Sequence, residues 1–179
     1  SVWTAQGEFV RDYIGPATYG GMGAAADPAD KTRVFGNGCE FKLDYEKNQA
    51  EVVAACASDN LVGDLVKREG REYFMVKRGA LYLRRGNALV TVARFGGARV
   101  QDAKKVDLPI TPPAGAKEWF SFLWCDANDD GQAQPEEIQT RADVASLDGG
   151  YWGGYWLDEN WNLYSSPGGY YRQTVGKLP

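Results

Sequence analysis

Histidine is absent from this sequence of 179 residues. Without an imidazole the chain can form no Ser-His-Asp or Cys-His nucleophile, no His-ligated zinc site and no attached c-type haem. The formal net charge is -4 with no long basic run, so nucleic acid is not an expected partner. No apolar run is long enough to cross a membrane. No signal peptide is visible and the chain opens on Ser1, which favours a mature or excised product.

Glycine and aromatic residues are abundant, with 22 glycines and an aromatic content of 13%. The apolar segments are short and separated by turns, which is typical of an all-β protein. We expect a hairpin over 39–56, a strand over 88–95, a turn at Gly96-Gly97 and a further strand over 99–106. Prolines 109, 112 and 113 make 107–117 a rigid spacer rather than a strand.

The hairpin expected over 39–56 carries two of the three cysteines. If Lys47-Asn48 is a two-residue turn, Leu43 faces Val52 and Cys39 faces Cys56. Opposed residues in an antiparallel pair lie close enough for a disulfide at a non-hydrogen-bonded site. A Cys39–Cys56 disulfide and two buried free thiols are equally compatible with this pattern. We interpret the third cysteine, Cys125, as a core residue.

The segment from Asp126 to Glu137 matches the pattern D-x-[DN]-x-[DN]-G-x5-E of a calcium-binding loop at every specified position. Calcium takes six to eight oxygen ligands at about 2.3–2.6 Å, and a coiled loop supplies them from alternate residues. Gly131 permits the sharp turn in the middle of the loop. The predicted ligands are Asp126, Asn128, Asp130, the carbonyl of Gln132, Gln134 through water, and Glu137 with both oxygens. An acidic surface turn without metal is the alternative.

The surroundings of this loop differ from those in a calcium sensor, where a helix lies on each side. Here the preceding segment Trp119–Cys125 is aromatic and β-prone, and Pro135 lies within the loop. Only 136–145 could form a short helix or another strand. We therefore expect an isolated calcium loop between strands, with Ca²⁺ as a structural cofactor.

Trp and Tyr are concentrated near the end of the chain, between Tyr151 and Tyr171. Exposed aromatic rings can stack on sugars, whereas buried rings fill the space between packed sheets. The candidate ligand-binding residues are Trp152, Trp156, Trp161 and Tyr164. Packing is the alternative interpretation and the favoured one. Nearby carboxylates such as Asp148, Asp158 and Glu159 could in principle act in a glycan-degrading enzyme.

Two segments carry a resemblance to a known family. The sequence from Gly154 to Tyr164, GYWLDENWNLY, resembles the blade motif of NHL-type β-propeller repeat proteins, and GEFVRDYIG from Gly7 to Gly15 is similar to another strand of those repeats. Together with the acidic loop, the chain resembles secreted propellers of planctomycete-like bacteria. The resemblance implies blades over about 1–58, 59–106 and 118–179. At about 40–50 residues per blade the chain holds three to four blades, an incomplete or fragment propeller. A β-sandwich or barrel is the alternative.

The expected function is that of a non-catalytic, calcium-stabilised, extracellular or periplasmic scaffold or interaction module. Its partners would be other protein chains or the remainder of a longer parent chain. The alternatives are a carbohydrate-binding module that uses the C-terminal Trp/Tyr cluster and a part of a glycan-degrading enzyme.

Overall fold

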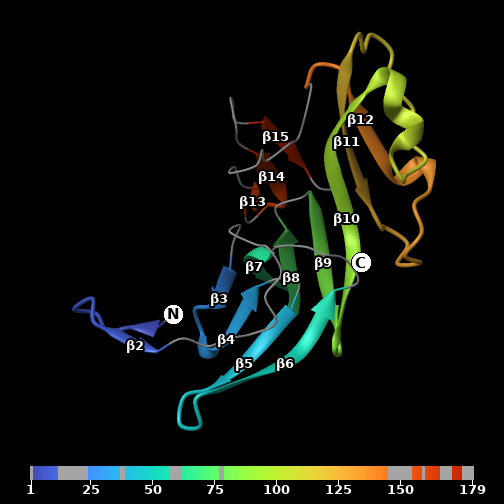
Figure 1. Ribbon diagram of the computed structural model, residues 1–179. Coiled ribbons are helices and arrows are strands. Elements are labelled where there is room, and N and C mark those ends of the chain that lie inside the picture. The colour runs from blue at the N-terminus through green and yellow to red at the C-terminus, as the bar shows by residue number, and fades with distance from the viewer. Residues whose placement is uncertain are drawn as a thin grey trace.

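The computed structural model describes residues 2–11, 24–36, 39–56, 62–76, 79–144, 155–158, 160–165 and 171–174. The fold is all-β, as predicted, and its main feature is a sheet of 10 strands. Eight of them form two antiparallel meanders (Figure 1). The first meander contains β3 (Ala24–Asp27), β4 (Asp30–Gly36), β5 (Cys39–Asp44) and β6 (Gln49–Cys56). The second contains β7 (Val62–Arg68), β8 (Arg71–Val76), β9 (Ala80–Arg85) and β10 (Ala88–Arg99).

The two meanders meet along both of their edges and form a nearly closed barrel. On one side β6 pairs with β10 in parallel, through Ala55 with Ala88 and Cys56 with Leu89. On the other side β3 lies beside β7. The predicted boundary between 58 and 59 falls between the meanders, but the sheet continues across it. The barrel named as an alternative is therefore what the sheet forms, and separate propeller blades are not confirmed.

The apolar interior of the barrel is built by side chains from opposite walls. Phe35 of β4 and Phe74 of β8 have ring centroids 4.7 Å apart, although these strands are not neighbours in the sheet. Because such contacts are possible only across the barrel, this face of the strands points inward. The buried cluster consists of Phe35, Phe74, Ala80, Tyr82 and Leu89.

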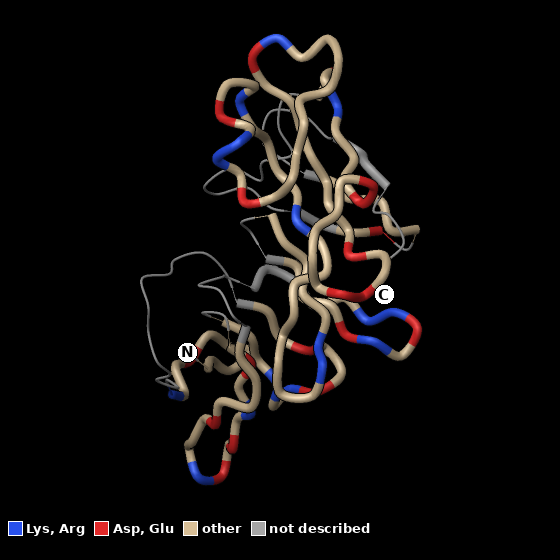
Figure 2. Tube along the Cα trace, turned by 90° about the vertical axis from the view of Figure 1, so that its right-hand side faces the viewer, with Lys and Arg blue, Asp and Glu red and all other residues tan. Residues whose placement is uncertain are grey.

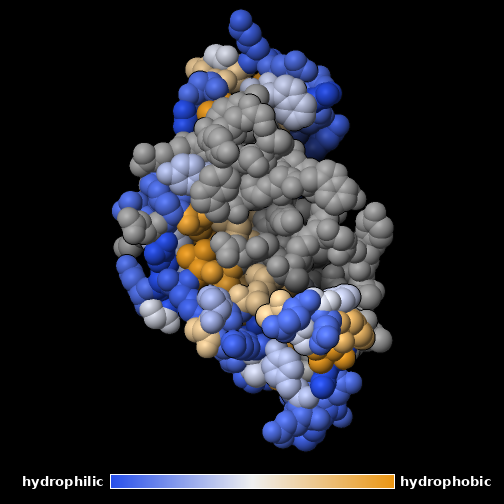
Figure 3. Space-filling view, turned by 90° about the vertical axis from the view of Figure 1, so that its left-hand side faces the viewer, coloured by the Kyte–Doolittle hydropathy of each residue, from blue (hydrophilic) through white to orange (hydrophobic). Residues whose placement is uncertain are grey.

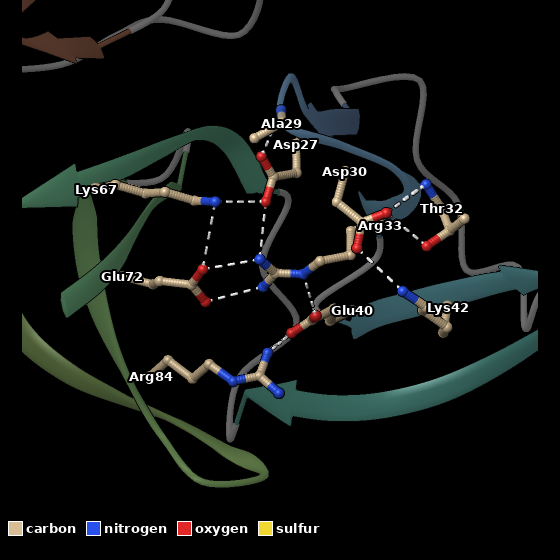
Figure 4. Close-up of polar contacts among 10 residues, drawn as sticks. All are labelled: Asp27, Ala29, Asp30, Thr32, Arg33, Glu40, Lys42, Lys67, Glu72 and Arg84. Carbon is tan, nitrogen blue, oxygen red and sulfur yellow. Dashed lines mark hydrogen bonds and ion pairs between the residues drawn. The ribbon is translucent and has the colours of Figure 1, made fainter. Parts of the chain in front are cut away.

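A network of six charged side chains occupies the interior next to this cluster (Figure 4). Arg33 donates two parallel hydrogen bonds to Glu72, each 2.8 Å long, from Nη1 and Nη2 to the two carboxylate oxygens. It also donates from Nη1 to Asp27 and from Nε to Glu40, again at 2.8 Å. Lys67 Nζ lies 2.6 Å from Asp27 Oδ2, and Arg84 forms an ion pair with Glu40.

The network joins the two meanders. Asp27, Arg33 and Glu40 come from the first meander, whereas their partners Lys67, Glu72 and Arg84 come from the second. The carboxylates of Asp27 and Glu40 have exposed fractions of only 1% and 3%. Buried carboxylates are tolerated because each one accepts hydrogen bonds from a cation.

The outer face of the second meander is covered by a separate sheet of three strands. These are β13 (Tyr155–Leu157), β14 (Asn162–Ser165) and β15 (Tyr171–Thr174). Leu163 is fully buried there and Trp161 packs its ring edge-on against Tyr73, with centroids 5.1 Å apart. The other buried members of this cluster are Val66, Met75, Leu81, Leu83, Val92, Ala93, Phe95, Leu123, Cys125 and Val144.

Strand β10 extends beyond the barrel and forms part of a second structural unit (Figure 1). Its far half pairs with β11 (Trp119–Cys125), which pairs in turn with β12 (Ile138–Arg141). A 3₁₀ helix, η1 (Val100–Lys105), follows β10 and packs with the spacer 107–117 onto this sheet. The spacer forms no strand, as predicted.

Two predictions for this region are wrong. Gly96-Gly97 is not a turn, because β10 runs straight through it opposite Phe122 and Ser121. A Cβ at Gly96 would lie 3.3 Å from the Phe122 ring, so glycine serves here to admit an aromatic side chain. The strand expected over 99–106 is η1 instead, and it ends β10 at Arg99.

The register of the β5–β6 hairpin also differs from the prediction. Leu43 pairs with Ala50 rather than Val52, and Cys39 pairs with Ala55 rather than Cys56. The turn spans four residues, because Asp44 accepts the backbone N–H groups of Glu46 and Lys47 at 3.0 and 2.9 Å. A bulge between Glu40 and Phe41 then shifts the register by one residue. The side chain of Cys56 lies outside the described residues, so the disulfide itself stays a prediction.

A hairpin at the start of the chain, β1 (Val2–Trp3) and β2 (Phe9–Arg11), forms a sheet of its own. Its apolar side chains are exposed, with fractions of 58% for Trp3, 54% for Phe9 and 44% for Val10. Arg11 Nη1 anchors the hairpin to the β5–β6 turn by donating to the Tyr45 carbonyl at 2.7 Å. Figure 3 shows the side of the molecule where this hairpin lies. Apolar residues, in orange, are visible in the lower half of that view.

Charges of both signs are interspersed along the described trace (Figure 2). Among the described residues, no helix is both long and apolar enough to span a bilayer.

Replacing Arg33 by methionine tests the barrel network. Removing one partner from buried ion pairs leaves charge uncompensated, and we expect R33M to lower the free energy of unfolding by about 3–5 kcal/mol. The matched control is K47M, which removes an exposed ion pair with Asp44 and should cost no more than about 1 kcal/mol. Urea denaturation of the three proteins at neutral pH measures both effects, and equal losses would contradict the assigned role.

The same variant predicts a pH dependence. The hydrogen bond from Lys67 lowers the pKa of Asp27, and that from Arg33 lowers the pKa of Glu72. A lowered folded-state pKa adds stability above the unfolded pKa of about 4, and that stability disappears as the pH falls through the folded pKa. The difference between wild type and R33M should therefore be full near neutral pH and shrink below about pH 4. Urea titrations across this range measure it, and a constant difference would exclude a contribution from the carboxylates.

Candidate metal centre

The acidic loop, Asp126–Glu137, connects β11 to β12. These strands pair antiparallel with Trp124 opposite Ile138, so the loop closes a hairpin. It contains only one short helical turn, η2 (Pro135–Glu137). The strand expected before the loop is present, and the segment after it contains β12. The acidic loop therefore lies between strands.

Asp126 forms the start of the loop and is 2% exposed. Its Oδ1 accepts the backbone N–H of Asp130 and its Oδ2 that of Gly131, both at 3.1 Å. Gly131 has a φ of 72°, a conformation in which glycine carries no steric cost. The predicted role of Gly131 in the turn is thus confirmed.

Asp130 lies at the centre of the loop and attracts the amide side chains. Its Oδ2 accepts hydrogen bonds from Asn128 Nδ2 at 3.1 Å and from Gln134 Nε2 at 2.8 Å. Its Oδ1 accepts the Gln132 backbone N–H at 2.8 Å. This backbone hydrogen bond is the main cause that lowers the pKa of Asp130, so its carboxylate is ionised at neutral pH.

Glu137 closes the loop by reaching back to its beginning. Oε1 accepts the backbone N–H groups of Ala127 at 2.9 Å and Asn128 at 3.3 Å. Oε2 accepts the indole N–H of Trp124 at 3.0 Å and the backbone N–H of Gln134 at 3.3 Å. Burial acts to raise the pKa of Glu137, but these hydrogen bonds outweigh it and the pKa is lowered. Both of its oxygens therefore carry negative charge inside the loop.

Two contacts fix the acidic loop to the barrel. The backbone N–H of Asp126 donates to the Val92 carbonyl at 2.9 Å, at the bulge between Thr91 and Ala93 of β10. Asp129 forms an ion pair with Arg85, the last residue of β9. Asp129 is not among the predicted ligands, so it attaches the loop, while Asp126, Asp130 and Glu137 accept hydrogen bonds within the loop.

The side chains of the loop offer oxygen atoms of the kind that calcium binds, and these atoms accept hydrogen bonds from backbone and amide N–H groups. Asp126, Asp130 and Glu137 supply carboxylate oxygens, and Asn128 and Gln134 supply amide oxygens, all of which hard cations bind. In the described part of the chain, no three His, Cys, Asp or Glu side chains gather into a group that could hold a metal. The reason lies in the contacts above, because the carboxylates are turned toward backbone and amide N–H groups.

Sequence reasoning missed Trp124 and Arg85. Trp124 was assigned to an aromatic strand, and only the pairing of β11 with β12 places its indole beside Glu137. Arg85 belongs to no motif of the sequence, and its partner Asp129 lies 44 positions away.

The aromatic cluster near the end of the chain is used for packing where its side chains are described. Trp161 contacts Tyr73, and the Arg68 guanidinium lies 5.9 Å from its ring centroid. Tyr164 donates its hydroxyl to Asp158 Oδ2 at 2.9 Å. Trp152 and the side chain of Trp156 lie outside the described residues, as do Asp148 and Glu159. Among the described residues, Trp119 is a further exposed tryptophan, with Arg99 over its ring at 4.9 Å.

Asp158 organises the β13–β14 turn. Its Oδ1 accepts the backbone N–H groups of Asn160 and Asn162 at 2.9 Å, and Asn162 Nδ2 donates to Oδ2 at 2.7 Å. Burial acts to raise the pKa of Asp158, but these bonds and that of Tyr164 lower it to about 2. A carboxyl group with so low a pKa is ionised at neutral pH, so it holds no proton to donate as a general acid.

Searches with the sequence and the structure find no family model, no curated protein and no solved structure that matches the chain.

We expect D158N to lower the thermal midpoint at neutral pH, because an amide nitrogen would face donors that the carboxylate now accepts. The stabilisation by Asp158 is present above the unfolded pKa of about 4 and is lost as the pH falls through the folded value of about 2. The effect of D158N should therefore decrease in acid. Calorimetric melts at neutral pH and in acid measure the effect of D158N on the thermal midpoint. N160D serves as a control for charge at the same turn. An unchanged midpoint at neutral pH would show that the turn does not need the carboxylate.

Proposed function

We propose that this protein is a non-catalytic, extracellular or periplasmic β module that calcium stabilises and that serves as a scaffold or interaction module. One observation carries the proposal. The carboxylates at the two ends of the acidic loop, Asp126 and Glu137, both face its interior, where backbone N–H groups already hold their oxygens. The acidic loop thus places the negative charges of these two carboxylates within one short segment of the chain.

Calcium would be held by Asp126, Asn128, Asp130, the Gln132 carbonyl, Gln134 through water, and Glu137 with both oxygens. Asn128 and Gln134 would turn their amide oxygens inward, since both now donate N–H groups to Asp130. A bidentate glutamate and a ligand number above six favour Ca²⁺ over the smaller Mg²⁺. The ion would stabilise the β11–β12 hairpin and, through Asp126 and Asp129, its attachment to β10 and Arg85.

The interaction role is supported by the β1–β2 hairpin. Trp3 and Phe9 stack edge-on with centroids 5.3 Å apart, yet both rings are more than half exposed. Exposed aromatic groups of this kind occur at protein–protein contacts. The extracellular location is part of the proposal through the resemblance to secreted repeat proteins.

Thermal unfolding with calcium and with chelator tests the proposal. A ligand that binds only the folded state adds about 2.7 kcal/mol at a hundredfold excess over its Kd, which raises the midpoint by about 5–10 °C for a chain of this size. D126N should lose most of this increase, because it removes a charged ligand. The matched control D143N removes an exposed carboxylate paired with Arg141, outside the loop, and should keep the full increase. An unchanged wild-type midpoint in calcium would contradict the proposal.

A further inference from the structure

The last ligand of the proposed site needs support from outside the loop. Glu137 stands at the junction of η2 and β12, and its four hydrogen-bond donors are of two kinds. The backbone N–H groups of Ala127, Asn128 and Gln134 belong to the loop and move with it. The indole N–H of Trp124 belongs to strand β11.

Trp124 belongs to the sheet rather than to the loop. It is 4% exposed, and its backbone is paired on both sides, with Arg94 of β10 and Ile138 of β12. The indole N–H can only donate a hydrogen bond. Glu137 therefore has to accept it with a carboxylate oxygen. This partly buried, charge-assisted hydrogen bond from a strand residue helps to define where the Glu137 carboxylate lies.

The four hydrogen bonds to Glu137 are of two lengths. The contacts from Asn128 and Gln134 are the long ones, both 3.3 Å. Those from Ala127 and Trp124 are short, at 2.9 and 3.0 Å. One long and one short contact fall on each oxygen, so each oxygen can release a weak donor to take a cation while it keeps a strong one.

We propose that Trp124 is a positioning residue of the metal site, whose indole N–H holds Glu137 in place for calcium and couples the ion to the buried strand β11. This inference rests on the proposed calcium site. Groups that orient metal ligands in this way typically change metal affinity by about 10–100-fold when they are removed.

Isothermal titration with calcium chloride on the full chain tests the inference. W124F keeps an aromatic ring but removes the indole N–H, and we expect it to weaken calcium binding about 10–100-fold. Two control variants on the same strand separate this from general damage. W119F alters an exposed tryptophan, and F120L alters a buried side chain of the η1 cluster. W119F should keep the wild-type calcium affinity. F120L should lower the melting temperature of the metal-free protein but leave its calcium affinity unchanged.

The outcomes distinguish the two proposals. Wild-type protein that binds calcium while W124F binds it equally tightly would overturn the role of Trp124 and leave the calcium site standing. Wild-type protein that does not bind calcium would overturn both. A similar loss of affinity in F120L would also overturn the specific role of Trp124, because core damage alone would then explain it.

A spectroscopic measurement on the wild type covers the case in which W124F does not fold. The chain has 6 tryptophans, and each indole N–H gives one signal in a nitrogen-15 correlation spectrum. We expect one signal that is protected from hydrogen exchange to shift on addition of calcium, with the midpoint found by calorimetry. Calcium binding that leaves all protected indole signals in place would overturn the inference.

Discussion

The barrel depends on how two four-stranded meanders are held edge to edge. Along one edge the backbone does this, through two residue pairs between β6 and β10 in the described part of the chain. Along the other edge and across the interior, side chains do it, because Asp27, Arg33 and Glu40 pair with Lys67, Glu72 and Arg84. Charges are costly to bury, so this arrangement ties stability to a complete set of partners. The apolar contact of Phe35 with Phe74 also holds the two meanders together.

The second structural dependency is the length of β10, which has 12 residues. Its first half belongs to the barrel and its second half to the sheet with β11 and β12. The change of neighbour occurs around the Val92 bulge, where the Val92 carbonyl accepts the N–H of Asp126. The candidate metal centre is therefore attached at the point where the barrel passes into the second sheet. An ion there would stiffen the connection between the two units as well as the loop.

Local patterns predicted much of the fold, and long-range contacts explain the rest. Alternation and turn residues predicted the all-β class, and the prolines predicted the absence of a strand in the spacer 107–117. They could not give the closure of the barrel, because Arg33 and Glu72 stand 39 positions apart and neither lies in a recognisable motif. Gly96-Gly97 was mistaken for a turn because glycine is needed there to make room for the Phe122 ring, which lies on another strand. The hairpin register failed because a local bond at Asp44 and a bulge at Phe41 outweighed the match of apolar faces.

The same contrast applies to the candidate site. The six predicted ligands share one short loop, so spacing alone was enough to predict them. Their supports, Trp124, Val92 and Arg85, follow from strand pairing, which the spacing does not contain. The four residues of the aromatic cluster near the end of the chain show the limit of composition. Where described, Trp161 and Tyr164 are engaged in packing and in the Asp158 turn, and aromatic density alone does not distinguish a sugar platform from an interface between sheets.

The parallel pairing of β6 with β10 has a consequence for how the chain folds. Each meander is made of hairpins between neighbouring strands, so its contacts are local and can form early. Ala55 and Ala88 meet only after three intervening strands have been laid down, and closing so long a segment costs entropy before any contact repays it. The meanders can therefore collapse separately, and their joining would be the late and slow event. Until then the carboxylates and cations of the future interior would remain in water, and their burial would come with the joining of the two meanders.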